Sequence, residues 1–186
     1  EFNERNIPKR ALYVGRLDPK KGIWNLVKSF NIIVNNNQRT DLKLTVVGGG
    51  ENLENLKAFV LKNKLNDYIT FAGYQSDPSS FYQQADYVII PTIIKEACPL
   101  VSLEARNFGL PILYSNSGGL PETVGASGTP LYGTTENEIS RSIIDFCSNK
   151  EKYKSLLMNT NKGLEYFSMD RMTDEYVNFY TTMFKE

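Results

Sequence analysis

Short continuous apolar runs alternate along the chain with segments in which apolar residues recur at helical spacing. In the helical segments, apolar residues recur every three or four positions, as in the segment that begins at Ile23. The continuous runs predict buried strands at 11–15, 42–47, 68–72, 87–90 and 112–115, and residues 128–132 are expected to form a last short strand. Strands that alternate with helices favour an α/β fold: a doubly wound, mostly parallel, Rossmann-like sheet with C-terminal helices.

The pattern becomes wholly helical towards the C-terminus. Thr135 to Glu138 forms a capping box before one helix, and apolar spacing predicts another helix from Glu151 to about Phe167. Ser168 is expected to cap a final helix that carries a stripe of large apolar side chains. The stripe consists of Met172, Tyr176, Phe179, Tyr180 and Met183. It suits either core packing, the commoner use, or docking on a further domain.

Several polar residues and glycines follow the predicted strands. In a doubly wound sheet, ligands bind beyond the carboxyl ends of the strands. Residues far apart in the sequence should therefore converge on one edge of the sheet. They are Arg16, Lys21, Gly48, Tyr74, Glu96 and Glu104.

The segment after the 87–90 strand holds two carboxylates, Glu96 and Glu104, with Pro99 between them. Proline suits the start of a helix, and a helix N-terminus offers free N–H groups to an anion. The segment is thus suited to a diphosphate, with carboxylates on either side for sugar hydroxyls. A glycosidase pair is the less favoured interpretation, because a helix start between the carboxylates suits an anion.

Composition narrows the classes of function. The 186 residues suit one domain with a sizeable core, and 21 basic against 21 acidic residues argue against nucleic acid as a partner. The chain has no histidine, which excludes Ser-His or Cys-His catalysis and histidine-bound metals within it. Two cysteines favour a reducing compartment, and no apolar run approaches the ~20 residues of a membrane span.

The segment after the strand that ends in Pro91 contains Glu96, then seven residues, then Glu104 followed by Ala105. This pattern resembles a motif of retaining glycosyltransferases of the GT-B fold, specifically family 4. The resemblance extends from Ala11 to Phe184. It implies that residues 1–186 are a single nucleotide-sugar-binding domain, the C-terminal half of an enzyme whose N-terminal acceptor domain is absent. The intact enzyme would transfer a sugar from a nucleotide-diphosphate donor and retain the anomeric configuration, whereas this fragment alone would lack efficient activity.

The same resemblance assigns the diphosphate site. Gly15-Arg16-Leu17 and Lys21-Gly22 match the family pattern for phosphate binding. The match implies that Arg16 and Lys21 bind the phosphates. Without it, the same loop reads as a solvated basic loop. The backbone N–H groups of Leu100 and Val101 would meet the sugar and phosphate.

Further roles follow from the resemblance. Glu104 would bind the ribose, and Glu96, taken as the catalytic residue, would bind hydroxyls of the transferred sugar. Gly73 and Tyr74 are candidates for the nucleobase loop. Four glycines are expected to shape the backbone: Gly15, Gly48, Gly118 and Gly119. No cofactor and no metal are expected.

One position departs from the family pattern. Many relatives carry Phe-Gly where this chain has Cys98-Pro99. Proline has no N–H, so one potential donor to the sugar-phosphate is lost. Donor choice near position 99 therefore does not follow from the resemblance.

Two alternatives remain open: an epimerase or phosphorylase that shares the GT-B architecture, and a non-catalytic nucleotide-binding module. The expected partners are a nucleotide sugar and the missing domain, with no nucleic acid. The expected location is the cytoplasm. Within the cytoplasm, the full-length enzyme would lie at the inner face of the membrane, with peripheral association only through the missing domain. Polysaccharide biosynthesis is the family's implied pathway.

Overall fold

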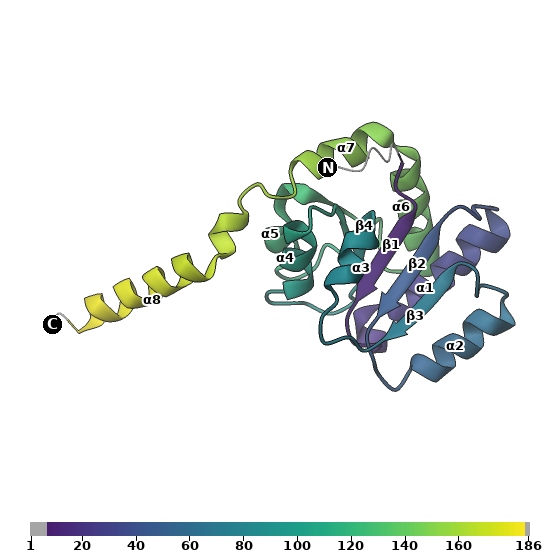
Figure 1. Ribbon diagram of the computed structural model, residues 1–186, viewed down its shortest axis with the longest axis horizontal. Helices are drawn as coiled ribbons and strands as arrows, with labels where there is room; N and C mark the ends of the chain where they lie inside the picture. The colour runs from purple at the N-terminus through teal and green to yellow at the C-terminus, as the bar shows by residue number, and fades with distance from the viewer. Residues whose placement is uncertain (1–6, 185–186) are drawn as a thin grey trace.

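The computed structural model describes residues 7–184, and its centre is a sheet of six strands. Figure 1 shows this sheet with helices around it. The strand order is β3-β2-β1-β4-β5-β6, and all neighbouring strands are parallel. The strands are β1 (Arg10–Val14), β2 (Lys43–Val47), β3 (Ile69–Gly73), β4 (Tyr87–Ile90), β5 (Ile112–Tyr114) and β6 (Gly128–Pro130). The predicted α/β doubly wound fold is confirmed, and the sheet is parallel throughout rather than mostly so.

The central strand β1 marks the point where the order of the sheet reverses. It pairs with β2 on one side, and with β4 on the other through Ala11 opposite Tyr87 and Leu12 opposite Val88. The strands that follow β1 are added on one side as far as β3, and those from β4 onward on the other. The carboxyl ends of β1 and β4 therefore diverge into loops that run to opposite faces of the sheet.

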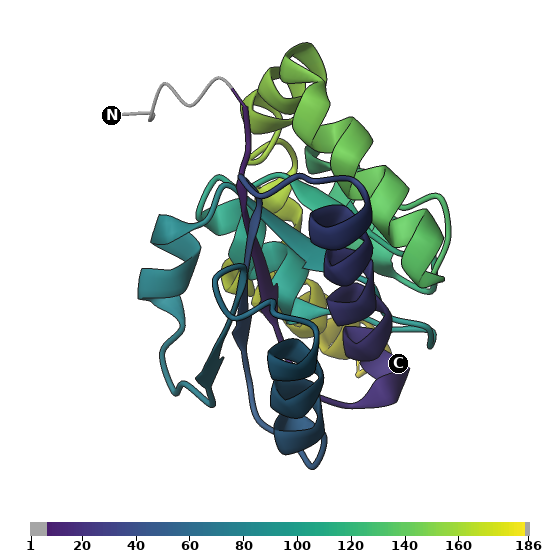
Figure 2. The same cartoon turned by 90° about the vertical axis from the view of Figure 1, so that its right-hand side faces the viewer.

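Helices cover both faces of the sheet (Figure 2). One face packs against α1 (Ile23–Asn31), α2 (Leu53–Lys62), α6 (Glu136–Ser148) and α7 (Lys150–Met158). The other packs against α3 (Ser79–Gln84), α4 (Leu100–Asn107) and α5 (Leu120–Val124). The remaining helical turns are η1 (Pro19–Lys21), the π-helix η2 (Ile32–Asn36) that continues α1, and η3 (Gly125–Ser127). Each face thus has its own core.

The capping box at the start of α6 forms as predicted: Thr135 and Glu138 bond reciprocally. The single helix expected from Glu151 to Phe167 is wrong. Helix α7 ends at Met158, a turn follows, and a 3₁₀ helix, η4 (Leu164–Phe167), comes after Gly163. Gly163 has φ +76°, a left-handed conformation that interrupts a helix and that glycine adopts without steric cost.

The final helix, α8 (Met169–Met183), begins at Ser168 as predicted, with the Ser168 hydroxyl accepting from the Arg171 N–H at 3.3 Å. It projects away from the sheet and its covering helices (Figure 1). None of its residues is buried. The apolar stripe of α8 is therefore exposed, and core packing within the described chain is not its role.

Arg106, on α4, joins this C-terminal region to the body of the fold. Its side chain is 1% exposed, and its guanidinium donates to three backbone carbonyls. The acceptors are Thr123 at 2.6 Å, Thr160 at 3.1 Å and Lys162 at 2.7 Å. One side chain thus ties α4 both to α5 and to the turn after α7.

Across residues 7–184, none of the helices combines the length and the apolar character needed to span a bilayer.

Candidate functional site

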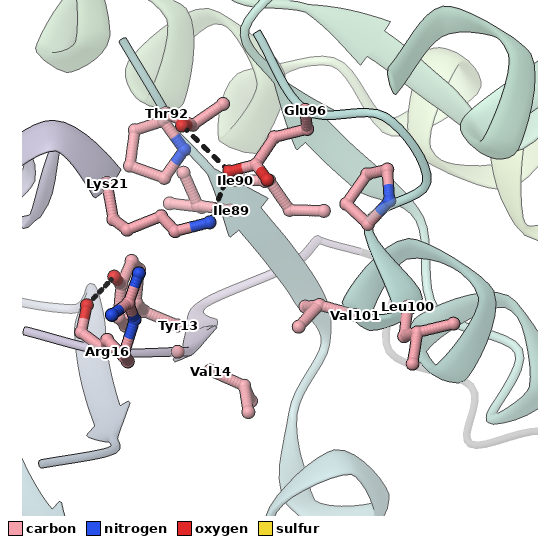
Figure 3. A pocket seen from close by; sticks show the side chains of 13 residues that line it. Tyr13, Val14, Arg16, Lys21, Ile89, Ile90, Thr92, Glu96, Leu100 and Val101 are labelled. Carbon is pink, nitrogen blue, oxygen red and sulfur yellow. Dashed lines mark hydrogen bonds and ion pairs between the residues drawn. The ribbon is translucent and has the colours of Figure 1, made fainter. Parts of the chain in front are cut away.

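A pocket of about 300 Å³ opens at the carboxyl edge of the sheet, between β1 and β4 (Figure 3). This is the switch point at which ligands bind in doubly wound sheets. Its lining comes from the ends of both strands, the loops that follow them, and the start of α4. The lining residues are Tyr13, Val14, Gly15, Arg16, Lys21, Ile89, Ile90, Pro91, Thr92, Glu96, Pro99, Leu100 and Val101.

An ion pair closes one side of the pocket. Lys21 Nζ contacts Glu96 Oε1, and both side chains are partly buried. The Thr92 hydroxyl lies 3.1 Å from the same carboxylate oxygen and 3.3 Å from the Lys20 carbonyl oxygen. Thr92 thereby links the loop that carries Lys21 to the loop that carries Glu96. Figure 3 shows the contacts that Thr92 and Lys21 make with Glu96.

Arg16 lies on another side of the pocket, on the loop after β1 (Figure 3). The Tyr13 hydroxyl donates to the Arg16 carbonyl oxygen at 2.8 Å and so holds the start of this loop. Burial, reinforced by Asp18 and Glu96, raises the pKa of the Tyr13 hydroxyl well above its usual range, so it stays a protonated donor. The Arg16 backbone is thus fixed while its side chain remains exposed.

Helix α4 points its N-terminus at the pocket. The first N–H groups of a helix have no partner within it, and the helix dipole makes that end positive. The N–H groups of Leu100 and Val101 occupy this position, whereas Pro99 before them has none. Together with Arg16 and Lys21, the helix end makes the pocket suitable for an anion.

The loop that carries Glu96 rests directly on two glycines. The Gly119 N–H donates to the Glu96 carbonyl oxygen at 2.7 Å. A Cβ on Gly119 would lie 1.9 Å from the Ala97 carbonyl oxygen, and one on Gly118 would lie 2.2 Å from that of Glu96. Gly118 also has φ +59°. Only glycine fits this close backbone approach.

Gly15 and Gly48 make a similar contact between the ends of β1 and β2. A Cβ on Gly48 would lie 1.8 Å from the Gly15 carbonyl oxygen. The Gly48 N–H donates to the Gly73 carbonyl oxygen at 2.8 Å. Gly73 ends β3, and the adjoining Tyr74 is 79% exposed. The candidate nucleobase residues are thus two strands away from the pocket, on the same edge of the sheet.

Glu104 lies one turn inside α4, outside the lining of the pocket. It is exposed, and its Oε2 accepts a hydrogen bond from the Tyr82 hydroxyl at 2.6 Å. The predicted site residues therefore fall into two groups. Those in the pocket lining are Gly15, Arg16, Lys21, Glu96, Leu100 and Val101, and those beside it are Gly48, Gly73, Tyr74, Glu104, Gly118 and Gly119.

Three polar residues with contacts to the predicted ones were missed from the sequence: Tyr13, Tyr82 and Thr92. Thr92 follows β4 by two positions, which was an available signal because residues at this edge are site candidates. Tyr13 lies within an apolar run, and Tyr82 follows Phe81 on a short, otherwise polar helix, so neither position signals a role in the site.

Within residues 7–184, no cluster of three acidic or cysteine side chains is placed to hold a metal ion. Cys98 is exposed and Cys147 is buried, and both are free thiols.

Comparison with known proteins gives a family match. The family model described as glycosyl transferases group 1 matches residues 1–163. The lipopolysaccharide 1,2-N-acetylglucosaminetransferase of Salmonella typhimurium is 34% identical over 167 residues, which cover 80% of this chain and 43% of that protein. The capsular polysaccharide glycosyltransferase CapM of Staphylococcus aureus is 29% identical over 178 residues, 94% of this chain and 46% of CapM. The chain thus spans about half the length of these curated relatives.

Solved structures share the fold. Anabaena HepE in complex with UDP superposes with a TM-score of 0.82 at 17% identity, over 94% of this chain and 49% of HepE. The C-terminal domain of the group 1 glycosyl transferase LpcC from Francisella tularensis superposes with a TM-score of 0.71 at 20% identity, over 88% of each chain.

Proposed function

Because the chain belongs to the glycosyl transferases group 1 family, we propose that it is the C-terminal, nucleotide-sugar-binding half of a retaining family 4 glycosyltransferase of the GT-B fold. The coverage supports this division. The chain spans 43–46% of two full-length relatives but 88% of a solved C-terminal domain. The other half of the enzyme would bind the acceptor.

The pocket at the switch point carries the proposal. It brings Arg16, Lys21 and the N-terminus of α4 to one anion-binding surface. In the proposed complex, the two cations and the N–H groups of Leu100 and Val101 bind the diphosphate. They neutralise the charge that develops on it as the leaving group, so the proposed reaction needs no metal and no other cofactor.

The remaining roles extend from the pocket along the same edge of the sheet. Glu96, as the proposed catalytic residue, accepts hydrogen bonds from hydroxyls of the sugar that is transferred. Glu104 binds the ribose, and Gly73 and Tyr74 lie beside the base. UDP is the first nucleotide to test, because the HepE structure was solved with UDP.

Helix α8 supports the proposed missing half. Its stripe of exposed apolar residues, Met172, Tyr176, Phe179, Tyr180 and Met183, has no covering element in residues 7–184. In the proposed enzyme this face docks on the N-terminal half. That half would also provide any peripheral attachment to the inner face of the membrane. A cytoplasmic location suits the two free thiols, and polysaccharide biosynthesis matches the named activity of relatives such as CapM.

Calorimetric titration of the chain with UDP, GDP, ADP and their common sugar conjugates tests the proposal. Two or three charge-assisted hydrogen bonds, after the costs of association, predict micromolar affinity for one nucleotide class. Selective binding that weakens in Arg16→Ala supports the proposed site. Absence of binding by every nucleotide would refute a complete donor site within this chain.

A further inference from the structure

Tyr82 and Glu104 form a hydrogen bond between two helices on the same face of the sheet. Tyr82 lies on α3 and is 1% exposed, whereas Glu104 on α4 is exposed. The phenolic hydroxyl donates to Glu104 Oε2 at 2.6 Å, a length typical of hydrogen bonds to a charged acceptor.

The core fixes the position of this hydroxyl. The Tyr82 ring stacks on Phe108, with centroids 5.1 Å apart and planes 5° from parallel. It belongs to the core cluster that packs β4 and β5 against α4 and α5. Phe108 follows Glu104 by four positions, so the ring that supports Tyr82 lies one turn away from the carboxylate that Tyr82 holds.

The protonation of Tyr82 suits a permanent donor. Burial, together with the hydrogen bond to Glu104 and the charge of that carboxylate, raises the pKa of Tyr82 far above its ordinary value. The hydroxyl therefore keeps its proton in the neutral pH range and remains a hydrogen-bond donor.

The bond restricts an otherwise mobile side chain. An exposed glutamate on a helix samples several rotamers, and ordering such a side chain costs up to about 2 kcal/mol. With Oε2 held by Tyr82, the carboxylate is already oriented. Oε1 and the remaining lone pairs of Oε2 are left for incoming donors, and the two hydroxyls of a ribose are such donors.

We propose that Tyr82 is a positioning residue that orients Glu104 for the ribose hydroxyls and so sets a preference for ribonucleotides over 2′-deoxyribonucleotides. This inference rests on the proposed function, in which Glu104 meets the ribose. It adds a residue from a separate helix to that subsite, and it concerns selectivity rather than the strength of diphosphate binding.

The test is a titration of wild type and Tyr82→Phe with a matched pair of probes. The pair is UDP and dUDP, GDP and dGDP, or ADP and dADP, according to which ribonucleotide the wild type binds most tightly. Tyr82→Phe keeps the stacked ring and removes only the hydroxyl. We expect wild type to favour the ribonucleotide at least about tenfold, and the variant to lose about three- to tenfold in ribonucleotide affinity but less in deoxynucleotide affinity, because the deoxynucleotide offers Glu104 only its 3′-hydroxyl.

Tyr87→Phe is the matched control, because Tyr87 is an equally buried tyrosine on β4 whose hydroxyl contacts Cys147 on the opposite face. It should leave the ratio of the two affinities unchanged. In the double variant Tyr82→Phe with Glu104→Gln, the loss of selectivity should not exceed that of Glu104→Gln alone.

The outcomes separate this inference from the proposed function. If wild type prefers the ribonucleotide and Tyr82→Phe keeps the same ratio, Tyr82 is only a core residue and the inference is overturned while the donor site stands. An equal fall in both affinities overturns the inference in the same way. If wild type binds none of the probes, the proposed function fails and this inference fails with it.

Discussion

Lys21 and Glu96 form an ion pair between two loops, although 75 positions separate them in the sequence. The first residue follows β1 and the second follows β4, so the pair closes the switch point of the sheet. In the proposed complex, Lys21 turns to a phosphate and Glu96 to sugar hydroxyls. The ion pair then holds both groups in place before the donor arrives and competes with it when it binds.

Glu96→Gln tests that competition. Removing the negative charge frees Lys21 for phosphate and eliminates repulsion of the diphosphate. We expect the affinity for the nucleoside diphosphate to be unchanged or up to about tenfold tighter, and the sugar conjugate to gain less. Calorimetry with both ligands measures this. Glu122→Gln, on the exposed surface of α5, is the control, and weaker diphosphate binding in Glu96→Gln would contradict the competition.

Arg16→Ala should weaken nucleoside diphosphate binding about tenfold or more, since it removes charge-assisted hydrogen bonds worth about 1.5–3 kcal/mol. Arg16→Lys should give an intermediate affinity, because lysine keeps the charge but loses the planar fork. Lys20→Ala is a matched control: Lys20 is an exposed cation on the same loop, outside the pocket lining. Equal affinities in wild type and Arg16→Ala would remove Arg16 from the site.

Gly118→Ala and Gly163→Ala separate backbone strain from a steric clash. Both glycines have left-handed φ values, +59° and +76°. A Cβ meets nothing within 4 Å at Gly163 but lies 2.2 Å from the Glu96 carbonyl oxygen at Gly118. Gly163→Ala should cost about 1–2 kcal/mol of unfolding free energy, and Gly118→Ala at least about 1 kcal/mol more. Urea denaturation measures both, and equal losses would rule out the clash.

Cys147 predicts a pH dependence of stability. Burial raises the pKa of its thiol to about 12. The folded chain therefore keeps this proton above pH 9, while the unfolded chain releases it. Stability should fall as pH rises from about 9 towards 12. Cys147→Ala should make that slope shallower by up to about 1.4 kcal/mol per pH unit.

Urea unfolding of wild type and Cys147→Ala between about pH 8.5 and 10.5 measures this difference in slope. Cys98→Ala is the control, because it also removes one free thiol, but an exposed one. Parallel pH profiles for wild type and Cys147→Ala would refute the assignment.

Arg106→Met should destabilise the fold by about 3 kcal/mol, because three backbone carbonyls lose their charged donor. Arg141→Met is the control: Arg141 is exposed and lies over the Tyr132 ring, so its loss should cost less than about 1 kcal/mol. Chemical denaturation compares the two. A smaller loss of unfolding free energy in Arg106→Met than in Arg141→Met would show that water satisfies the three carbonyls as well as the guanidinium does.

The fold follows from the sequence because its signals are local. The strands β1 to β5 are rich in apolar residues, and the capping box at Thr135 marks the start of α6 within the sequence itself. The error at 151–167 arose because apolar residues resume at Leu164, after the polar stretch 159–163. Asn159, the C-cap of α7, and Gly163, the N-cap of η4, were signals of a turn that the apolar spacing outweighed.

The candidate site was only partly predictable for a physical reason. The topology of the sheet brings strand ends together, so Arg16, Lys21 and Glu96 could be grouped in advance. The orientation of a side chain depends on its neighbours from other elements. Glu104 is held by Tyr82, 22 positions earlier in the sequence, and the spacing of apolar residues does not predict that contact.

The seam between β1 and β4 has a thermodynamic consequence. These two strands pair from Ala11 opposite Tyr87 to Leu12 opposite Val88, and Arg10 forms an ion pair with Asp86 at the start of the same junction. A ligand that touches both loops binds only the chain in which the two halves are assembled. At a hundred times its dissociation constant, it would add about 2.7 kcal/mol to the free energy of unfolding. Such a ligand would then stabilise the sheet reversibly in the cell. Its depletion would lower the resistance of the chain to thermal unfolding and to proteolysis.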